Sequence, residues 1–258
     1  MMKVPVSVVV ITKNEEDNIA DCLKSASWAD EIVVLDDNSS DNTVSLARQY
    51  TDKVFSRKMD IEGRHRNYAY GLAKNTWVLS LDADERVSPE LAEEIRSIIN
   101  SDPKDKVYSI PIKSYIGSRW IEHGGWYPAA KDRLFDKRTF KYEEADVHPR
   151  VFYEGTCGHL KGDIVHYSYR NFHDYFVSLN NQTTLEAKKW LKENRKMGFL
   201  KMYRKAVSRF LKAYLQKKGY KDGRLGFLIA YGSGLYQLMS YAKYQEMADN
   251  QKNGEVKL

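Results

Sequence analysis

The 258-residue sequence predicts an α/β protein with a mostly parallel central sheet. Residues 6–11 are dominated by β-branched side chains, which is typical of a strand buried on both faces. Short apolar segments then alternate with segments of helical period, as in βαβ units. Polar clusters follow three of the expected strands directly. In a parallel sheet the carboxyl ends of the strands form the ligand-binding edge, so these clusters are expected to meet there.

Taken in order, the first half alternates strands with helices, because apolar residues change from a continuous to a helical spacing after each strand. Strands are expected at residues 6–11, 31–35, 53–56 and 77–81. Helices are expected from Ile19, over 44–50 and 63–74, and after Ser88. The second half predicts strands within 107–116, a loop and strand over 158–166, and a helix over 174–191.

The segment TWVLSLDADER, residues 76–86, holds two closely spaced carboxylates, Asp82 and Asp84. In an extended chain both would point to one side, because side chains alternate with period two. Carboxylate oxygens suit Mg²⁺ or Mn²⁺, especially a metal that also carries phosphate oxygens. The alternative is a strand end followed by a helix cap at Ser88, and the two interpretations are compatible. The position of this segment as the third polar cluster favours the metal site.

Charge is unevenly distributed along the chain. The net charge is +6, but the residues from Lys188 onward contain 17 Lys and Arg against 5 Asp and Glu, a net of +12, which leaves −6 for the rest. An acidic body with a basic tail argues against a nucleic-acid binder and for an electrostatic attachment segment. No GxGxxG or Walker A sequence occurs, which disfavours dinucleotide dehydrogenases and P-loop enzymes. The two cysteines match no zinc spacing, so a reduced compartment is expected.

Three ordered motifs, VSVVVITKNEEDNIADCLKS, EIVVLDDNSSDNT and WVLSLDADE, resemble the family 2 glycosyltransferases of GT-A fold. Within this family, the sequence resembles the branch that includes lipopolysaccharide-core β-glucosyltransferases. This resemblance implies an inverting, metal-dependent transfer of a sugar from a nucleotide-sugar donor, with UDP as the expected nucleotide. The implied acceptor is a lipopolysaccharide core or a lipid-linked glycan.

The resemblance also implies roles for individual residues. The nucleotide is expected to contact Thr12, Asn14, Glu15, Asp37, Arg66, Asn67 and Asp82. Asp84, Asp82 and His166 would hold the divalent metal, and Arg133 would lie beside the diphosphate or acceptor. Independently of the resemblance, the aromatic ring of Trp126 is a candidate to stack against a sugar of the acceptor. Arg suits phosphate because its guanidinium forms paired, charge-assisted hydrogen bonds. The alternatives are a solvated helix face for Arg66 and Asn67, core packing for Trp126, and a purely structural His166.

Inverting transfer needs a base within reach of the acceptor hydroxyl. Many relatives have Glu where this chain has Pro149, so Asp146 is the first candidate, followed by Glu144 and His148. The missing Glu motivates an alternative function, a catalytically impaired nucleotide-sugar-binding or scaffolding protein at the membrane. A nucleotidyltransferase would use a similar sheet, but it would normally carry a Gly-rich phosphate loop after the first strand.

The expected organisation is a glycosyltransferase domain over residues 1–196, with a nucleotide-binding half over 1–100 and an acceptor half over 101–196. A helical segment over 197–258 follows. From Phe199 this segment has apolar and basic faces at helical spacing, which favours association with an anionic membrane surface over packing on the body. Residues 225–242 carry no charge but are diluted by glycines, so an interfacial helix is expected rather than a membrane span. The expected location is the inner face of the cytoplasmic membrane.

Overall fold

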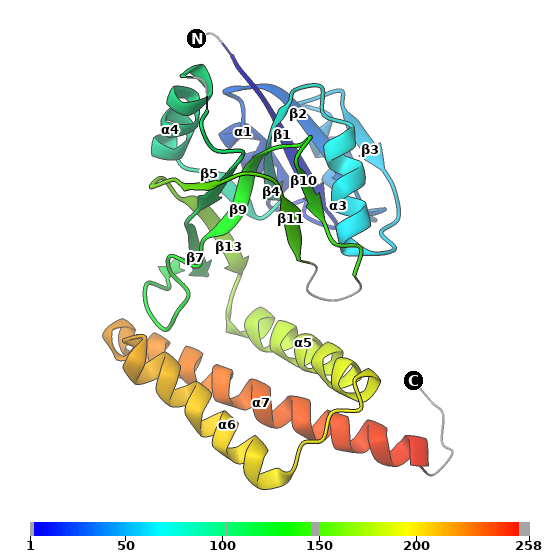
Figure 1. The fold of residues 1–258 in the computed structure, drawn as a ribbon, viewed down its shortest axis with the longest axis vertical. Helices are drawn as coiled ribbons and strands as arrows, with labels where there is room; N and C mark the ends of the chain where they lie inside the picture. The colour runs from blue at the N-terminus through cyan, green and yellow to red at the C-terminus, as the bar shows by residue number, and fades with distance from the viewer. Residues whose placement is uncertain (1–2, 102, 146–149, 253–258) are drawn as a thin grey trace. The chain divides into compact units, whose positions relative to one another are not determined.

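The computed structural model describes residues 3–101, 103–145 and 150–252. The chain forms two compact units. The first consists of Met1–Lys113 and Ala129–Tyr167, and the second of Ser114–Pro128 and Ser168–Leu258. The chain passes from one unit to the other within β7 (Ile112–Ile116) and β13 (Ile164–Tyr169), which are labelled in Figure 1.

A seven-stranded sheet forms the centre of the first unit, in the order β12-β6-β9-β4-β1-β2-β3. Its strands are β1 (Val4–Thr12), β2 (Ala29–Asp36), β3 (Val54–Ser56), β4 (Trp77–Asp82), β6 (Val107–Ile110), β9 (Lys131–Asp136) and β12 (Cys157–His159). All neighbours run parallel except β9, which is antiparallel to both β4 and β6. This confirms the α/β fold with a mostly parallel sheet and agrees with the expected GT-A fold.

Both faces of this sheet are covered, which explains the apolar composition of β1. Val8 and Val10 pack in one cluster with side chains of α1 (Ile19–Ser25) and α4 (Pro89–Asn100). Val9 packs in a second cluster with side chains of α3 (Glu62–Gly71) and of β10. This unit also contains α2 (Thr43–Ala47) and the antiparallel pair β10 (Phe140–Tyr142) and β11 (Val151–Tyr153).

The segment that follows β4 differs from the expected extended Asp-Ala-Asp. The strand ends at Asp82, Ala83 and Asp84 form a turn, and β5 (Glu85–Val87) begins immediately afterwards. Asp84 directly precedes β5, which pairs antiparallel with the first residues of β13, and the carbonyl of Asp84 accepts the N–H of Tyr167 at 3.0 Å. The expected helix cap is present one step later, where the Ser88 hydroxyl accepts the N–H of Leu91 at 3.1 Å.

The second unit is built around three long helices, α5 (Phe172–Lys192), α6 (Phe199–Leu211) and α7 (Gly223–Lys252), with β8 (Arg119–Trp120) in its N-terminal segment. Both α5 and α6 pack along α7 (Figure 1). The boundary expected at residue 197 therefore differs from the division by packing, which groups α5 with the two later helices. No helix in the described part of the chain is both long enough and apolar enough to cross a bilayer.

A π-helical stretch (Lys212–Gln216) and a 3-10 turn (Gly219–Asp222) connect α6 to α7. Gly219 begins the 3-10 turn and Gly223 begins α7, whereas Gly226 lies inside α7. A Cβ at Gly226 would lie 1.7 Å from the carbonyl oxygen of Gly219, so only glycine allows the two segments to approach this closely.

Candidate active site

The loops that follow β1 and β2 are bound to each other at the carboxyl edge of the sheet. The N–H of Asp37 donates to the carbonyl of Thr12 at 2.9 Å. Asn14 takes a left-handed backbone with φ of 52°, its N–H donates to the Ser39 hydroxyl at 2.8 Å, and its side-chain oxygen accepts the N–H of Ser40 at 2.8 Å. Asn tolerates this conformation better than most residues. Asn14 therefore joins the loop after β1 to the loop after β2 through its own hydrogen bonds.

Asp37 is buried beside this loop and is already paired. One carboxylate oxygen accepts from Lys13 Nζ at 2.8 Å and the other accepts the N–H of Met59 at 2.7 Å. Burial raises the pKa of Asp37, but the hydrogen bonds from Lys13 and Met59 lower it more, so the net pKa is below the ordinary value. Asp37 is thus an ionised acceptor at neutral pH. Lys13 is exposed and can move away when a ligand donor replaces it.

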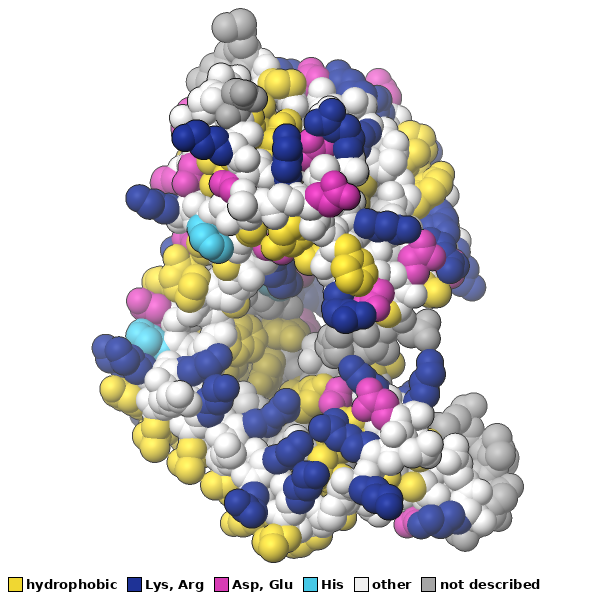
Figure 2. Space-filling view, in the orientation of Figure 1, with side chains coloured by type: hydrophobic (Ala, Val, Ile, Leu, Met, Phe, Trp, Pro, Cys, Tyr) yellow, Lys and Arg dark blue, Asp and Glu magenta, His cyan; other side chains and the backbone are white. Residues whose placement is uncertain are grey.

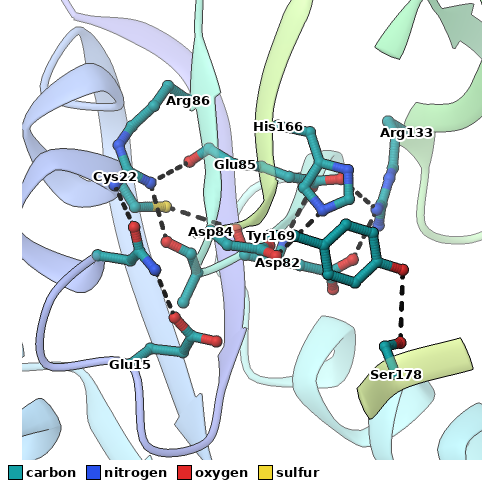
Figure 3. A network of polar contacts seen from close by, with 12 residues as sticks. Glu15, Cys22, Asp82, Asp84, Glu85, Arg86, Arg133, His166, Tyr169 and Ser178 are labelled. Atoms are coloured by element: carbon teal, nitrogen blue, oxygen red, sulfur yellow. Dashed lines mark hydrogen bonds and ion pairs between the residues drawn. The ribbon is translucent and has the colours of Figure 1, made fainter. Parts of the chain in front are cut away.

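Asp82 lies between two arginines. One of its oxygens accepts from Arg66 Nη2 at 3.0 Å and the other from Arg133 Nη2 at 2.7 Å. Burial raises the pKa of Asp82, but the charges of Arg133 and Arg66 lower it by more. The net pKa of Asp82 therefore lies well below its usual range. Arg133 also donates to Glu85 Oε1 at 2.7 Å, and Glu85 Oε2 accepts the N–H of Asp82 at 2.8 Å. Figure 3 shows Asp82, Glu85 and Arg133 of this group from close by.

Asp84 and His166 form the second polar pair of this edge. The Nε2 of His166 on β13 lies 3.0 Å from Asp84 Oδ2. Burial lowers the pKa of His166, but the hydrogen bond and the charge of Asp84 raise it more, and the net pKa is above the ordinary value. Their side chains are 22% and 23% exposed, so a ligand can reach them. The two point toward each other in Figure 3.

Asp84 and His166 fit a divalent metal that brings further ligands of its own. No group of three or more His, Cys, Asp or Glu side chains arranged for a metal occurs among the described residues. A carboxylate and an imidazole that already lie within 3.0 Å of each other can both turn toward one cation. Mg²⁺ is commonly held by one or two protein carboxylates, with substrate phosphates and water at its other positions. Asp82 is committed to two arginines and would act through them or through water.

Several buried polar atoms near this edge have no hydrogen-bond partner among the described residues. They are Thr12 Oγ1, both ring nitrogens of His65, Arg66 Nη1 and Arg133 Nε. Burying a polar group without a partner costs about 1–3 kcal/mol. Such groups are usually bonded to water or ligand in the working protein. Around Asp37 and Asp82 these atoms leave hydrogen-bonding capacity for water or for a polar ligand.

Some predicted residues have other partners in the structure. The side-chain amide of Asn67 donates to the carbonyl of Tyr142 and accepts its N–H, both at 2.9 Å, so it fixes β10 against α3. The carboxylate of Glu15 accepts from Asn18 at 2.7 Å. Trp126 belongs to the second unit, where it packs against Tyr169 with ring centroids 6.3 Å apart. Asn67 is thus structural in this arrangement.

Of the three candidate bases, Glu144 is the one that lies within the described residues. Glu144 lies at the surface and pairs with Arg64, with Nε 3.0 Å from Oε2. Asp146 and His148 lie outside the described residues, as does Pro149.

Two residues that shape the site were not among the predicted ones: Lys13 and Glu85. Lys13 lies within the TKNE cluster, and its charge opposite Asp37 was the available signal. Glu85 follows the acidic pair directly, but its full burial could not be read from local pattern. His65 is also fully buried, although it stands among charged neighbours in the sequence.

A mostly parallel sheet with acidic residues and arginines at its carboxyl edge is typical of an α/β protein with a ligand site at that edge. Residues 7–210 match the family model of glycosyl transferase family 2. The chain therefore belongs to glycosyl transferase family 2 and is a glycosyltransferase, as the sequence motifs predicted.

Curated relatives extend over nearly the whole chain. An uncharacterized glycosyltransferase of Rickettsia typhi is 26% identical over 96% of this chain and 89% of its own length. The lipopolysaccharide core biosynthesis glycosyltransferase LpsC of Rhizobium meliloti is 23% identical over 95% of this chain and 94% of its own. Among solved structures, Staphylococcus aureus TarS 1–349 in complex with UDP is 14% identical, covers 100% of this chain and 93% of its own, and has a TM-score of 0.48.

Proposed function

We propose that the chain is an inverting, metal-dependent glycosyltransferase that moves a sugar from a UDP-sugar to a lipopolysaccharide-core or lipid-linked glycan. The observation that carries this proposal is the accessible Asp84–His166 pair next to the arginine-bound Asp82, at the carboxyl edge of the sheet. A nucleotide diphosphate matches this combination of metal ligands and cations. The name of the relative LpsC supports the choice of acceptor.

In the proposed reaction, a base takes the proton of the acceptor hydroxyl while its oxygen attacks the sugar carbon opposite the diphosphate. UDP then leaves, and no covalent enzyme intermediate forms. Asp84 and His166 would hold the divalent metal, which when bound offsets negative charge on the diphosphate. Arg66 would donate its unpartnered Nη1 to the diphosphate. Arg133 is 2% exposed and instead positions Asp82.

The nucleotide would occupy the loops after β1 and β2. Asp37 would accept from the uracil N3–H once Lys13 moves aside, and Thr12 Oγ1 would gain the partner that it lacks. A screen of nucleotide sugars for those that raise the unfolding temperature in the presence of Mn²⁺ tests the donor class. A UDP-sugar should give the largest shift. Equal shifts with all nucleotide sugars, or none with any, would contradict the proposal.

Changing Asp146 to Asn is expected to lower the release of UDP from the donor found in that screen, because water then lacks the base that activates it. A general base contributes about 10²–10⁴-fold to rate, which sets the size of the loss. UDP binding, measured by calorimetry, should stay the same. Glu144→Gln is the matched control, since Glu144 is held by Arg64 at the surface.

A loss with Glu144→Gln and none with Asp146→Asn would move the role of base to Glu144. If the wild-type chain binds UDP-sugars but turns over none of them with any acceptor, the alternative of a nucleotide-sugar-binding scaffold is favoured.

We also propose that the second unit lies on an anionic membrane surface. The face of α6 that packs inward consists of small or flexible residues, Met202 and Ala206, followed by Ala213. The larger apolar residues form a stripe that points to solvent: Phe199, Leu200, Tyr203, Val207, Leu211 and Leu215. Figure 2 shows yellow side chains along the lower rim of this unit, next to dark-blue lysines and arginines. The outward stripe argues against the alternative in which the apolar face packs on the body.

Replacing Phe199 and Leu200, which are 68% and 70% exposed, with serine is expected to weaken binding to phosphatidylglycerol vesicles. Burying one large apolar side chain stabilises by about 1.5–3 kcal/mol, so the double variant should lose at least about tenfold in affinity. Vesicle co-sedimentation measures this. The matched control is Tyr50→Ser with Phe55→Ser, two exposed aromatic residues of the first unit. Equal losses in both double variants would contradict the assigned surface.

A further inference from the structure

A cavity of about 390 Å³ lies within the second unit, between α5, α6, α7 and the glycine-containing segment before Trp126. This volume is in the range of small-ligand sites in proteins. The residues of the proposed nucleotide and metal site all belong to the first unit, so they do not account for this cavity. Its lining combines aromatic rings, which suit a sugar ring, with cations, which suit an anion.

One wall of the cavity is aromatic. Trp126 packs against Tyr169 and Tyr175, with ring centroids 6.3 Å and 6.2 Å apart, and all three line the space. Trp126 and Tyr169 remain partly exposed. Rings that are held by each other and present a face to a cavity offer a flat, weakly polar surface with little entropy to lose. Such a surface suits the C–H face of a sugar ring.

Cations line the same space. Arg209, Lys212 and Lys217 all contribute to the lining, and no Asp or Glu does so among the described residues. The Arg209 guanidinium lies over the ring of Tyr236, 5.0 Å from its centroid. Lys217 is held by its carbonyl, which accepts the N–H of Gly124 at 2.9 Å, and its side chain extends past Gly125.

None of these three cations forms an ion pair with an acid in the part of the chain that the structure describes, although most of the first-unit site cations do. Three exposed positive charges around one cavity with no carboxylate among its described lining residues favour a bound anion. Charge-assisted hydrogen bonds from Arg and Lys to phosphate are among the stronger polar contacts in proteins.

The cavity adjoins the outward apolar stripe of α6. Lys212 lines both the cavity and the groove that Tyr203, Leu211 and Leu215 form on the stripe. A ligand held in the cavity can therefore continue into the surface that we assign to the membrane. This continuity matches a glycolipid, whose sugars and lipid chains are joined in one molecule.

We propose that this cavity binds a phosphate-bearing sugar residue of the acceptor, with the aromatic wall against the ring and Arg209, Lys212 and Lys217 on the phosphate. The inference rests on the proposed function only in identifying the ligand as part of the acceptor. The preference for a sugar phosphate follows from the residues that line the cavity.

Titration of the full chain with glucose 6-phosphate, glucose, glucuronate and inorganic phosphate, followed by calorimetry, tests the proposal. Glucose 6-phosphate should bind at least about tenfold more tightly than the other three probes, because only it has both the ring and the dianion. Arg209→Gln combined with Lys217→Gln should weaken that binding at least about tenfold. The charge-matched control, Lys188→Gln with Lys196→Gln, removes two exposed lysines outside the cavity and should leave the affinity unchanged.

A second variant addresses folding. Ser233→Leu keeps every charge but narrows the cavity that Ser233 lines, and it should also weaken binding. Thermal unfolding at the wild-type temperature shows that each variant is folded. Equal affinity for inorganic phosphate and glucose 6-phosphate, equal affinity for glucuronate, or unchanged binding in folded variants would each overturn the proposal.

UDP titration in the presence of Mn²⁺ is made on the same wild-type protein. Absence of UDP binding would contradict the proposed transferase and leave the sugar-phosphate site standing. UDP binding without glucose 6-phosphate binding would overturn only the cavity assignment.

Discussion

Changing Asp84 to Asn is expected to lower donor turnover by about 10²–10³-fold, the usual cost of removing one electrostatic group that stabilises a leaving oxyanion. Asp84 lies in the turn after β4, and its side chain is partly exposed to solvent. Of the other predicted metal ligands, it pairs with His166. Asn keeps the size of the side chain but carries no charge, so the metal would bind much more weakly. UDP release from the donor measures turnover.

A second measurement does not depend on activity. In the wild type, UDP should raise the unfolding temperature in Mn²⁺ and much less after chelation with EDTA. Asp84→Asn should behave in Mn²⁺ as the wild type does in EDTA. Glu93→Gln, which removes an exposed carboxylate on α4, is the control and should keep the full shift. A UDP shift that is indifferent both to chelation and to Asp84→Asn would remove the metal from the proposed function.

Changing Arg133 to Met is expected to lower the free energy of unfolding by about 3–5 kcal/mol, the range found when one partner of a buried ion pair is removed. Arg133 is 2% exposed and binds Glu85, which is fully buried, as well as Asp82. Methionine fills a similar volume, so the loss reports the charge that remains without its partner. Urea unfolding followed by circular dichroism measures the difference.

Two comparisons make this result specific. Arg150→Met breaks an exposed pair with Glu143, and pairs of this kind contribute only about 0–1 kcal/mol. Adding Glu85→Leu to Arg133→Met should restore part of the lost stability, because the buried carboxylate is then gone too. A loss below about 1 kcal/mol for Arg133→Met alone, or a larger loss in the double variant, would contradict the assigned role of this network.

Much of the first unit was predictable because its signals are local. The apolar run at residues 6–11 matches β1, and the strand expected at 77–81 matches β4 to within one residue. Helix spacing predicted α1, α3, α4 and α5. These patterns report which side chains must leave water, and a parallel sheet covered on both faces follows from them.

The sequence predicted which sheet edge carries the candidate site, but not which of its side chains bond to each other. The location of Asp37, Asp82 and Asp84 follows from strand ends, and family motifs named Arg66 and His166. The bond between Arg133 and Asp82 joins residues 51 positions apart, and that between Asn67 and Tyr142 joins residues 75 apart. No periodic pattern encodes such a distance, because it depends on how β9 and β10 pack beside β4 and α3.

The sequence by itself determined the α/β class, the three polar clusters at one sheet edge, the family and the basic, amphipathic character of α6. These properties depend on spacing and composition over a few residues. Only the tertiary structure decided which face of α6 is buried, that Arg133 is held between two carboxylates, and that aromatic rings and unpaired cations surround one cavity. The physical reason is that burial and charge pairing are set by contacts between distant segments, and the same helical pattern satisfies either an inward or an outward apolar face until those contacts form.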